Sequence, residues 1–485
     1  MSPMWSFVGW GLLLIVIAEI IDGFAHPRGL RTMRGIVLRL LPVAIVMAGL
    51  VALLGSFWLS AIIAMLLLLS TVVGSNIKYE ILGEPLVFSD LIVFISFLRA
   101  PKFYLHAIPV ALRVALPIVF MGLLLVMVRI ARSGDSDSRL DGVLVAFVLG
   151  VLSFMVARRA TIMKSPDLGP DVRRFGLLST LVMYSVRWRR ERPPLPISPL
   201  KAVDAPPLLI VIQCESFADP RQLFNDTMEM PGLALARHKA ILHGNLLPSG
   251  FGAYTMRTEY GVMCGRDDSA LGFRRYDPFL TSDQETSFAL PNRLAASYPD
   301  RVFIHPHDMR FYSRHRIVPN WGFNQIVGDD RFAPDAAVGP YIGDIPFGAS
   351  IAGLAHDATK PTLIYGVSME NHGPWKSNRM GMASAADAYR AHLANSDRML
   401  HNLITDLGNM RADALLVFYG DHRPSIPNVV HHKSGRATPY VMLRFVDGRC
   451  QATSPRQADL TPAMLHQEIL AQLSNQSPQA ANSPS

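Results

Sequence analysis

The sequence has little cysteine and little charge for its length. Three cysteines in 485 residues (Cys214, Cys264 and Cys450) are too few for a disulfide framework, which excludes the disulfide-stapled class of small secreted folds. Only 17% of the residues are charged whereas 50% are hydrophobic, and this is too apolar for one ordinary soluble domain. Cys214 falls in a predicted buried strand, where a thiol usually packs as a small hydrophobe.

The apolar excess is confined to the first third of the chain. Residues 1–160 are dominated by Leu, Val, Ile and Ala, whereas residues 200–475 have the composition of a globular domain. One crossing of a bilayer needs about 20 apolar residues. The segments that approach or reach this length are 5–24, 35–54, 57–75, 106–128 and 142–157. The apolar stretch 86–98 is shorter, so we expect five spans, or six if this stretch also crosses.

The formal net charge of +8 does not indicate nucleic-acid binding, because the basic residues flank the apolar segments. This placement suits contact with anionic lipid head groups. The residues concerned are Arg28, Arg31, Arg34, Arg158 and Arg159, together with the arginines of 187–192. We therefore expect a membrane partner and no nucleic acid.

Loop charge leaves the orientation open. The positive-inside rule favours the cytoplasm for the loop that carries Arg28, Arg31 and Arg34. With five spans the soluble domain would then also be cytoplasmic, and with six spans it would face outward. We expect the outward orientation on the chemical grounds given below.

The chain divides into four parts by composition. We expect a transmembrane domain over 1–157, a connector over 158–206, a catalytic-type domain over 207–472 and a disordered tail over 473–485. Within the connector, residues 171–192 mix arginine with apolar and aromatic residues, as a basic interfacial helix does. The alternative is a solvated helix that packs on the soluble domain. A proline-rich, stiff spacer follows.

Metal-binding and proton-handling residues follow four strand-like runs of the soluble part. Strand-like runs that alternate with helical segments predict a layered α/β domain, and ligands bind at the carboxyl ends of strands in open α/β sheets. Each run is followed by one or two candidates: 208–214 by Glu215, 302–304 by His305 and His307, 363–368 by His372, and 415–420 by Asp421 and His422.

Glu215, Asp421, His422 and Thr255 form a mostly oxygen donor set. Such a set favours one divalent metal, with Mn²⁺ as first choice and Mg²⁺ or Zn²⁺ as alternatives. Thr255 follows a glycine-rich stretch and lies near the expected start of a helix, where a hydroxyl beside a metal becomes a usable nucleophile. The alternatives are that Glu215 only stabilises a helix N-terminus and that Thr255 is only an N-cap.

A second group of residues suits the binding of an anionic head group. Histidine and arginine close together favour a phosphate or a negatively charged transition state. His372, between a strand end and Gly373-Pro374, is placed to protonate a leaving oxygen or to hold a substrate phosphate. The alternative is a polar surface loop in each case. The other candidates are His305, His307, Tyr312 and Arg314.

Four short motifs occur in order along the soluble part and together resemble one family. They are Glu215-Ser216-Phe217, Thr255-Met256-Arg257-Thr258-Glu259-Tyr260, Asn371-His372-Gly373-Pro374 and Tyr419-Gly420-Asp421-His422. Over roughly 207–445 the chain resembles the lipoteichoic acid synthase family, within the alkaline phosphatase and sulfatase superfamily. That family includes phosphoglycerol transferases that act on periplasmic glucans. The resemblance implies an α/β/α sandwich of alkaline phosphatase/sulfatase type for the soluble domain.

The resemblance also implies residue roles. Thr255 would be the nucleophile, and Glu215, Asp421 and His422 would be the metal ligands beside it. The head group would be bound by His305, Tyr312, Arg314 and His372. Tyr312 stands where the Gram-positive synthases usually have tryptophan, and Met256-Arg257 replaces the small residues common after the nucleophile, so head-group contact and acceptor choice are expected to differ.

The implied activity is phosphoglycerol transfer from phosphatidylglycerol, an anionic phospholipid, to a glycan acceptor through a phospho-threonine intermediate. Donors and acceptors of this family lie outside the bacterial inner membrane, which is why we expect an outward catalytic domain. The alternatives are a phosphoethanolamine transferase, a phosphodiesterase that uses water, and a non-catalytic glycan-binding domain. A sulfatase nucleophile motif is missing at Cys264, because Arg266 and Asp268 stand where proline and arginine are needed.

Overall fold

The computed structural model describes residues 3–91, 135–159, 161–225, 227–375, 379–451 and 455–474, with a few positions between 121 and 132. Three expected segments lie wholly or largely outside these residues: the span 106–128, most of the stretch 86–98 and nearly all of the tail 473–485. The chain forms two compact units, Met1–Glu191 and Arg192–Ser485, which are described separately.

The N-terminal unit is helical. Its described elements are α1 (Pro3–Gly23), η1 (Met33–Gly35), α2 (Ile36–Leu54), α3 (Phe57–Leu82), α7 (Ser136–Arg159), α8 (Leu168–Phe175) and α9 (Leu177–Trp188). Three of the described helical stretches are long and apolar enough to cross a membrane: Met33–Leu54, Phe57–Leu82 and Ser136–Arg159. The prediction of N-terminal apolar helices is therefore confirmed.

Backbone hydrogen bonds identify the two ends of this helical unit. At one end the Asp135 N–H, just before α7, donates to the Gly55 carbonyl between α2 and α3, at 3.3 Å. At the other end the Thr32 N–H donates to the Arg174 carbonyl of α8, at 2.8 Å. The basic loop 24–35 and the connector thus lie at the same end.

The connector holds two helices, so the expectation of one helix over 171–192 is wrong. Gly176 separates α8 from α9 with a φ of +91°, and an added Cβ there would meet Asp22 Oδ2 at 2.3 Å and Arg39 Cδ at 2.4 Å. Only glycine tolerates both that backbone conformation and that close approach. Because Arg31 also donates to the carbonyls of Val172 and Arg173, the helix pair packs on the α1–α2 loop.

The second unit is an α/β domain around one large sheet. Its main strands are β1 (Leu208–Cys214), β2 (Leu242–Leu246), β3 (Asp300–Ile304), β4 (Gln325–Val327), β7 (Thr362–Val367), β8 (Ala414–Gly420) and β9 (Thr438–Val446). The strand order is β11-β2-β9-β8-β1-β7-β3-β4, where β11 is Arg456–Gln457, and β10 (Arg449–Cys450) pairs with β9. A separate hairpin joins β5 (Ala337–Val338) to β6 (Tyr341–Ile342).

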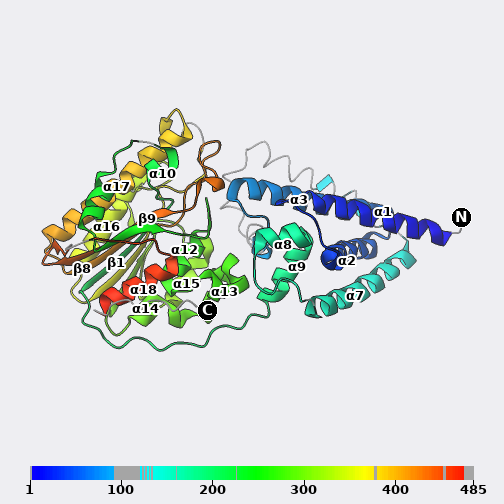
Figure 1. The fold of residues 1–485 in the computed structure, drawn as a ribbon, viewed down its shortest axis with the longest axis horizontal. Coiled ribbons are helices and arrows are strands. Elements are labelled where there is room, and N and C mark those ends of the chain that lie inside the picture. The colour runs from blue at the N-terminus through cyan, green and yellow to red at the C-terminus, as the bar shows by residue number, and fades with distance from the viewer. Residues whose placement is uncertain are drawn as a thin grey trace. The chain divides into compact units, whose positions relative to one another are not determined.

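Helices cover both faces of the sheet, as Figure 1 shows. On one face lie α16 (Asp344–His356) and α17 (Ala385–Asn409), and on the other α12 (Thr255–Cys264), α15 (Arg314–Asn320) and α18 (Pro462–Leu473). Helix α11 (Pro231–Lys239) packs against α17. Every residue of β1, β7 and β8 is buried. Parallel strands covered on both faces read as continuous apolar runs, which is why the sequence showed them so clearly.

The central strands bring their carboxyl ends to one edge. Strand β1 pairs in parallel with β8 and with β7, and β7 pairs in parallel with β3. The last paired residues are Cys214 with Gly420, and Ile304 with Gly366. The residues that follow the four strands therefore share one edge of the sheet, as the strand-end pattern predicts.

Candidate active site

Two adjacent strand ends place two carboxylates side by side. Because Cys214 pairs with Gly420, the next residues along the two strands are Glu215 and Asp421. Gly420 makes this possible: an added Cβ would meet the Phe217 carbonyl oxygen at 1.9 Å, so the chain leaving β1 crosses directly over a position that has no side chain.

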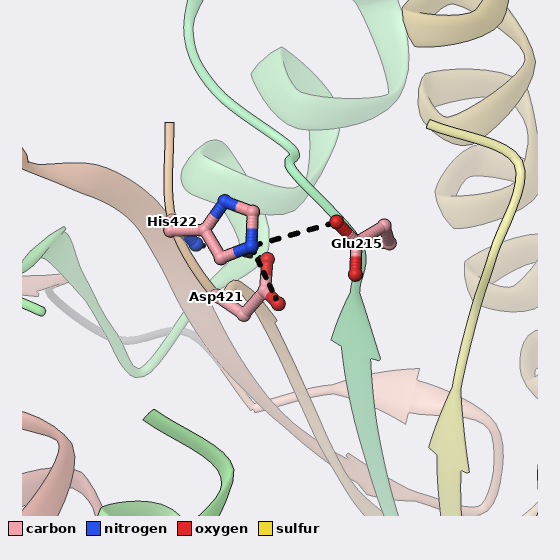
Figure 2. Close-up of side chains that lie close together, drawn as sticks. All are labelled: Glu215, Asp421 and His422. Carbon is pink, nitrogen blue, oxygen red and sulfur yellow. Dashed lines mark hydrogen bonds and ion pairs between the residues drawn. The ribbon is translucent and has the colours of Figure 1, made fainter. Parts of the chain in front are cut away.

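The carboxylates converge on one imidazole, as Figure 2 shows. His422 Nε2 lies 3.5 Å from Glu215 Oε1 and 3.5 Å from Asp421 Oδ2. One ligand atom from each of these buried residues lies within 4.8 Å of the other two. Two ionised carboxylates around one neutral imidazole would give this buried cluster a net negative charge.

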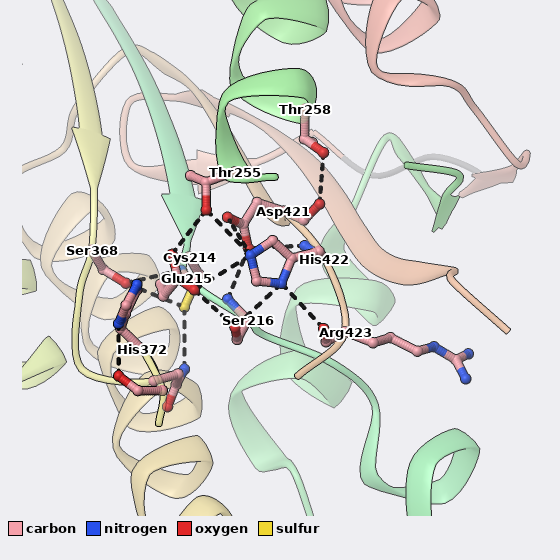
Figure 3. Close-up of polar contacts among 12 residues, drawn as sticks. Cys214, Glu215, Ser216, Thr255, Thr258, Ser368, His372, Asp421, His422 and Arg423 are labelled. Carbon is pink, nitrogen blue, oxygen red and sulfur yellow. Dashed lines mark hydrogen bonds and ion pairs between the residues drawn. The ribbon is translucent and has the colours of Figure 1, made fainter. Parts of the chain in front are cut away.

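Thr255 places a hydroxyl on this cluster (Figure 3). It is the first residue of α12, and it follows Tyr254, whose φ of 75° turns the chain into the helix. Thr255 Oγ1 lies 3.2 Å from His422 Nε2 and 3.4 Å from Glu215 Oε2. The expectation that Thr255 begins a helix is confirmed, and its side chain faces the metal-type ligands.

Two hydroxyl residues hold the cluster in place, and their contribution was missed from sequence. Ser216 donates from Oγ to Glu215 Oε1 at 2.8 Å and from its backbone N–H to Asp421 Oδ1 at 2.8 Å. Its φ of 48° lies in the left-handed region, a strain tolerated where a site demands it. Thr258, one turn after Thr255, donates to the Asp421 carbonyl at 2.7 Å. Both residues occur within the quoted motifs, but only the fold shows what they touch.

Burial and like charge perturb the acids. Burial, with Glu215 beside it, raises the pKa of Asp421 to about 7. Burial also acts to raise the pKa of Glu215, but His422 and His372 outweigh it and the pKa is lowered. Burial acts to lower the pKa of His422, but Asp421 and Glu215 raise it. Without a metal, a proton shared by Asp421 and His422 thus offsets part of the negative charge that a bound cation would otherwise neutralise.

The cluster fits a divalent metal ion on three observations. Asp421 Oδ2 is buried and accepts no hydrogen bond within the described residues, so one oxygen is left for a ligand. His422 Nδ1 lies 3.1 Å from the Arg423 carbonyl, so it carries the proton and leaves the Nε2 lone pair for a metal. The donors are carboxylate, imidazole and hydroxyl groups, which suit Mn²⁺, Mg²⁺ or Zn²⁺.

Arg314 is bound to the helix that carries Thr255. Its Nη2 donates to Glu259 Oε2 at 2.6 Å, and its Nε lies 3.3 Å from Glu259 Oε1. Its Nη1 lies 3.3 Å from His305 Nε2, and His305 Nδ1 lies 2.9 Å from the Val367 carbonyl. Both ring nitrogens of His305 are thus engaged, and burial beside Arg314 holds its pKa well below the usual range. His305 supports Arg314 and has no exposed surface.

The remaining predicted residues form an aromatic wall. The rings of His307 and His372 lie 6.0 and 5.4 Å from that of Tyr341 in β6. Tyr341 Oη is 3.1 Å from His372 Nδ1. Tyr312, with a φ of 55°, lies under the Arg314 guanidinium at 5.2 Å. Burial lowers the pKa of His307 and raises that of Tyr312.

The structure therefore divides the candidates into two sets. Glu215, Thr255, Asp421 and His422 are in mutual contact. His305, Tyr312 and Arg314 form one connected group, and His307 and His372 meet at Tyr341. Glu259 and Tyr341 were missed as site-forming residues. Glu259 had a signal, because a carboxylate four residues after Thr255 lies on the same face of the helix, whereas Tyr341 lies in a two-residue strand without a pattern.

Comparison with known proteins follows this geometry. The family described as Sulfatase matches residues 207–462, more than half of the chain. The chain belongs to the sulfatase family. This sulfatase-family chain combines N-terminal apolar helices with a mixed α/β domain of sulfatase type, as predicted.

Individual relatives are more distant. The capsular polysaccharide biosynthesis protein RkpI of Rhizobium meliloti (strain 1021) is 29% identical over 415 residues, which cover 79% of this chain and 77% of RkpI. The Neisseria meningitidis phosphoethanolamine transferase EptA superposes with a TM-score of 0.49 at 12% identity, over 92% of this chain and 96% of EptA. The Streptococcus pyogenes phosphoglycerol transferase GacH gives a TM-score of 0.46 at 16% identity, over 57% of this chain and 76% of GacH.

Proposed function

We propose that this chain is a membrane-anchored, metal-dependent phosphoglycerol transferase. It moves phosphoglycerol from phosphatidylglycerol to a glycan hydroxyl through a covalent intermediate on Thr255. The observation that carries the proposal is the Thr255 hydroxyl, held at a helix N-terminus 3.2 Å from His422 Nε2 and 3.4 Å from Glu215 Oε2. Glu215 and the proposed metal would activate this hydroxyl as a nucleophile, and the N-terminus of α12 would stabilise the phosphate that it attacks.

Four residues would hold the metal: Glu215, Asp421 and His422, with Thr255 Oγ1 as the fourth ligand. Mn²⁺ is our first choice for this oxygen-rich set, with Mg²⁺ and Zn²⁺ as alternatives. When bound, the ion would lower the pKa of the threonine hydroxyl and neutralise charge on the reacting phosphate.

The residues account for two displacements. In the first, Thr255 Oγ1 forms a bond to the donor phosphorus, and the bond from phosphorus to the diacylglycerol oxygen breaks. Glu215 Oε2 is placed to take the hydroxyl proton, and His372 is placed to protonate the leaving oxygen. In the second, the glycan hydroxyl gives its proton to His372 and its oxygen bonds to the same phosphorus. The bond from phosphorus to Thr255 Oγ1 breaks, and Glu215 returns the proton to that oxygen.

Charge on the transferred phosphate is stabilised by the protein itself. The N-terminus of α12, a helix of 10 residues that begins at Thr255, carries a partial positive charge that favours an anion beside the Thr255 hydroxyl. Arg314 keeps N–H groups beyond the three bonds described and supplies a fixed positive charge. His307, Tyr312 and His372 then form the wall that would hold the glycerol moiety.

The membrane unit and the polysaccharide relative support the choice of donor and acceptor. A phospholipid leaves a bilayer only at high cost, so an enzyme that uses one gains from being anchored beside it. RkpI is named for capsular polysaccharide biosynthesis, and a glycan acceptor agrees with that name. We propose the inner membrane as the location, with the catalytic domain facing outward, where such glycans are modified.

Intact-mass spectrometry of the purified full chain tests the proposal. After incubation with phosphatidylglycerol, Mn²⁺ and no acceptor, we expect one phosphoglycerol group on Thr255, identified by peptide fragmentation, and diacylglycerol in the lipid extract. Thr255→Ala must carry no adduct. An adduct formed only from phosphatidylethanolamine would replace glycerol by ethanolamine as the head group. An adduct on another residue would overturn the nucleophile.

A further inference from the structure

We propose that the membrane unit holds a binding site for an anionic phospholipid between α2 and α7, distinct from the catalytic centre. A cavity of about 460 Å³ opens there. Its walls combine two guanidinium groups and a hydroxyl with five apolar side chains. The lining residues are Arg34, Leu38, Leu152, Met155, Val156, Arg159, Thr161 and Ile162.

The two arginines of this cavity are not neutralised by the chain. Arg34 and Arg159 are both exposed, and neither makes an ion pair with any residue that the structure describes. Their neighbours differ: Arg39 pairs with Glu19 at 2.8 Å, and Arg31 with Asp22 at 3.4 Å. Two unpaired cations at one cavity therefore attract an anion.

The apolar walls extend from the arginines into the membrane-spanning segments. Leu38 lies one turn after Arg34, and Met155 and Leu152 lie one and two turns before Arg159. Leu38 is 2% exposed, whereas Leu152 and Met155 are 43% and 45% exposed. Charge at the end of two spanning helices with an apolar groove directly below it matches a lipid head group followed by acyl chains.

The phosphodiester of a diacyl lipid is the occupant that uses both parts of the cavity. A free phosphate would use only the arginines, and a zwitterionic lipid would bring its own cation between them. The cavity lies at the end of the helical unit that carries the connector, because Arg159 is the last residue of α7. The connector helices α8 and α9 have only 8 and 12 residues, which is too few to cross a bilayer, so they stay at that end. A role as a donor-lipid site rests on the proposed function, whereas lipid binding itself does not.

Native mass spectrometry of the full chain, released from detergent micelles, measures this binding. The probes are phosphatidylglycerol and phosphatidylcholine with the same acyl chains, and glycerol phosphate as a competitor without chains. The test variant is Arg34→Gln with Arg159→Gln. The matched control is Arg28→Gln with Arg158→Gln, which removes the same charge from two exposed arginines at the same end that do not line the cavity.

We expect the test variant to bind phosphatidylglycerol roughly 30-fold more weakly, and the control to change by less than about threefold. Leu152→Trp, which fills the groove and keeps both arginines, should also weaken binding. Equal losses in test and control variants would reduce the effect to general surface charge and overturn the site. So would equal binding of phosphatidylcholine, or full competition by glycerol phosphate.

A second measurement separates this site from the proposed chemistry. Thr255→Ala should bind phosphatidylglycerol as the unmodified chain does, because Thr255 is far from α2 and α7 in sequence and belongs to the other compact unit. If no phosphoglycerol adduct forms on Thr255 but the arginine pair still controls lipid binding, the proposed function fails and the lipid site stands. If the adduct forms and the arginine pair has no effect on binding, the lipid site fails alone.

Discussion

The two units of this chain both bury charged side chains, but they balance the charge differently. In the membrane unit two acids each have an arginine of their own: Glu19 pairs with Arg39 and Asp22 with Arg31. At the strand ends of the sulfatase-type domain, Glu215 and Asp421 share one imidazole, and Asp421 Oδ2 accepts no hydrogen bond within the described residues. Ion pairs in which each carboxylate has its own arginine join helices. Two carboxylates that share one imidazole leave negative charge that favours a cation. The predictions below test this contrast.

The largest effect is expected from the nucleophile. Thr255→Ala removes the only atom proposed to bond to phosphorus, and it should lower phosphoglycerol transfer by a factor on the order of 10⁴ or more. Transfer of radiolabelled phosphoglycerol from lipid to glycan measures it. Thr255→Ser keeps a hydroxyl and should retain clear activity, while both variants should melt within a few degrees of the unmodified chain. Substantial turnover by the alanine variant would remove Thr255 from the chemistry.

Asp421→Asn tests the unbalanced cluster directly. The variant keeps the shape of the side chain but removes one ligand charge, so bound metal measured by elemental analysis should fall to near zero. After chelation the same variant should be more stable than the unmodified chain, because one of two repelling carboxylates is gone.

Asp22→Asn is the matched change in the balanced network. It leaves Arg31 without its carboxylate and should cost about 1–3 kcal/mol in unfolding free energy while leaving the metal content unchanged. If both aspartate variants changed stability in the same direction in metal-free protein, the proposed contrast between the two clusters would be wrong.

Glu259→Gln tests whether a balanced pair also serves the active site. Glu259 and Arg314 are both buried and share a two-point contact, so losing one partner should cost about 3–5 kcal/mol in denaturant unfolding. Without Glu259 to hold it, Arg314 should be less well placed to bind the lipid phosphate, so the variant should raise KM for the lipid more than it lowers kcat. A change in stability with an unchanged KM would make the pair purely structural.

Metal-free protein should lose stability as pH rises from about 4 to about 7. Burial beside Glu215 raises the pKa of Asp421 to about 7, so the folded state holds a proton that the unfolded state has already released above pH about 4. Folding therefore binds protons in this window and is weakened as pH rises. Asp344 behaves alike, since burial and Glu370 raise its pKa to about 7.

Chemical denaturation across this pH range, with chelator and with Mn²⁺, measures the trend. We expect Mn²⁺ to abolish the Asp421 part of the slope, and Asp421→Asn to abolish the same part without metal. The slope due to Asp344 should survive both changes, since Asp344 is not one of the proposed ligands. A slope that metal leaves unchanged would contradict the assignment to Asp421.

The smallest effect is expected at the aromatic wall. Tyr341→Phe removes the hydroxyl 3.1 Å from His372 Nδ1 and keeps the ring, so transfer should fall by about three- to tenfold. A lipid with a faster leaving group should restore most of the rate if Tyr341 acts by orienting His372. Equal losses with both lipids would assign Tyr341 to binding instead.

The sequence predicted the strand ends well because buried parallel strands leave long apolar runs, and Glu215 and Asp421 each follow one. It did not predict that the two carboxylates are neighbours, because the register of β1 against β8 is a tertiary property. Arg314 was expected to face substrate, but most of its donors are engaged by Glu259 and His305. No local pattern distinguishes these two uses of an arginine.

Loop charge gave a weak signal for membrane orientation because the sequence does not show which arginines are engaged within the protein. The loop 24–35 was counted as free positive charge, yet Arg31 is bound to Asp22 and to carbonyls of α8. Arginines that hold helices together need not report on the side of the membrane. The single Gly176 that breaks the connector is visible in the sequence, but its positive φ and its contact with Asp22 are not.

The pairing of β1 with β8 has a consequence for how the enzyme acquires its metal. Glu215 and Asp421 come from opposite ends of the domain sequence and meet only when the central sheet has closed. If the domain crosses the membrane as proposed, the unfolded chain in transit would carry no assembled ligand set and would not retain an ion from the compartment where it was made. Loading with the proposed metal would then follow folding, and the choice among Mn²⁺, Mg²⁺ and Zn²⁺ would depend on the ions available where the sheet closes.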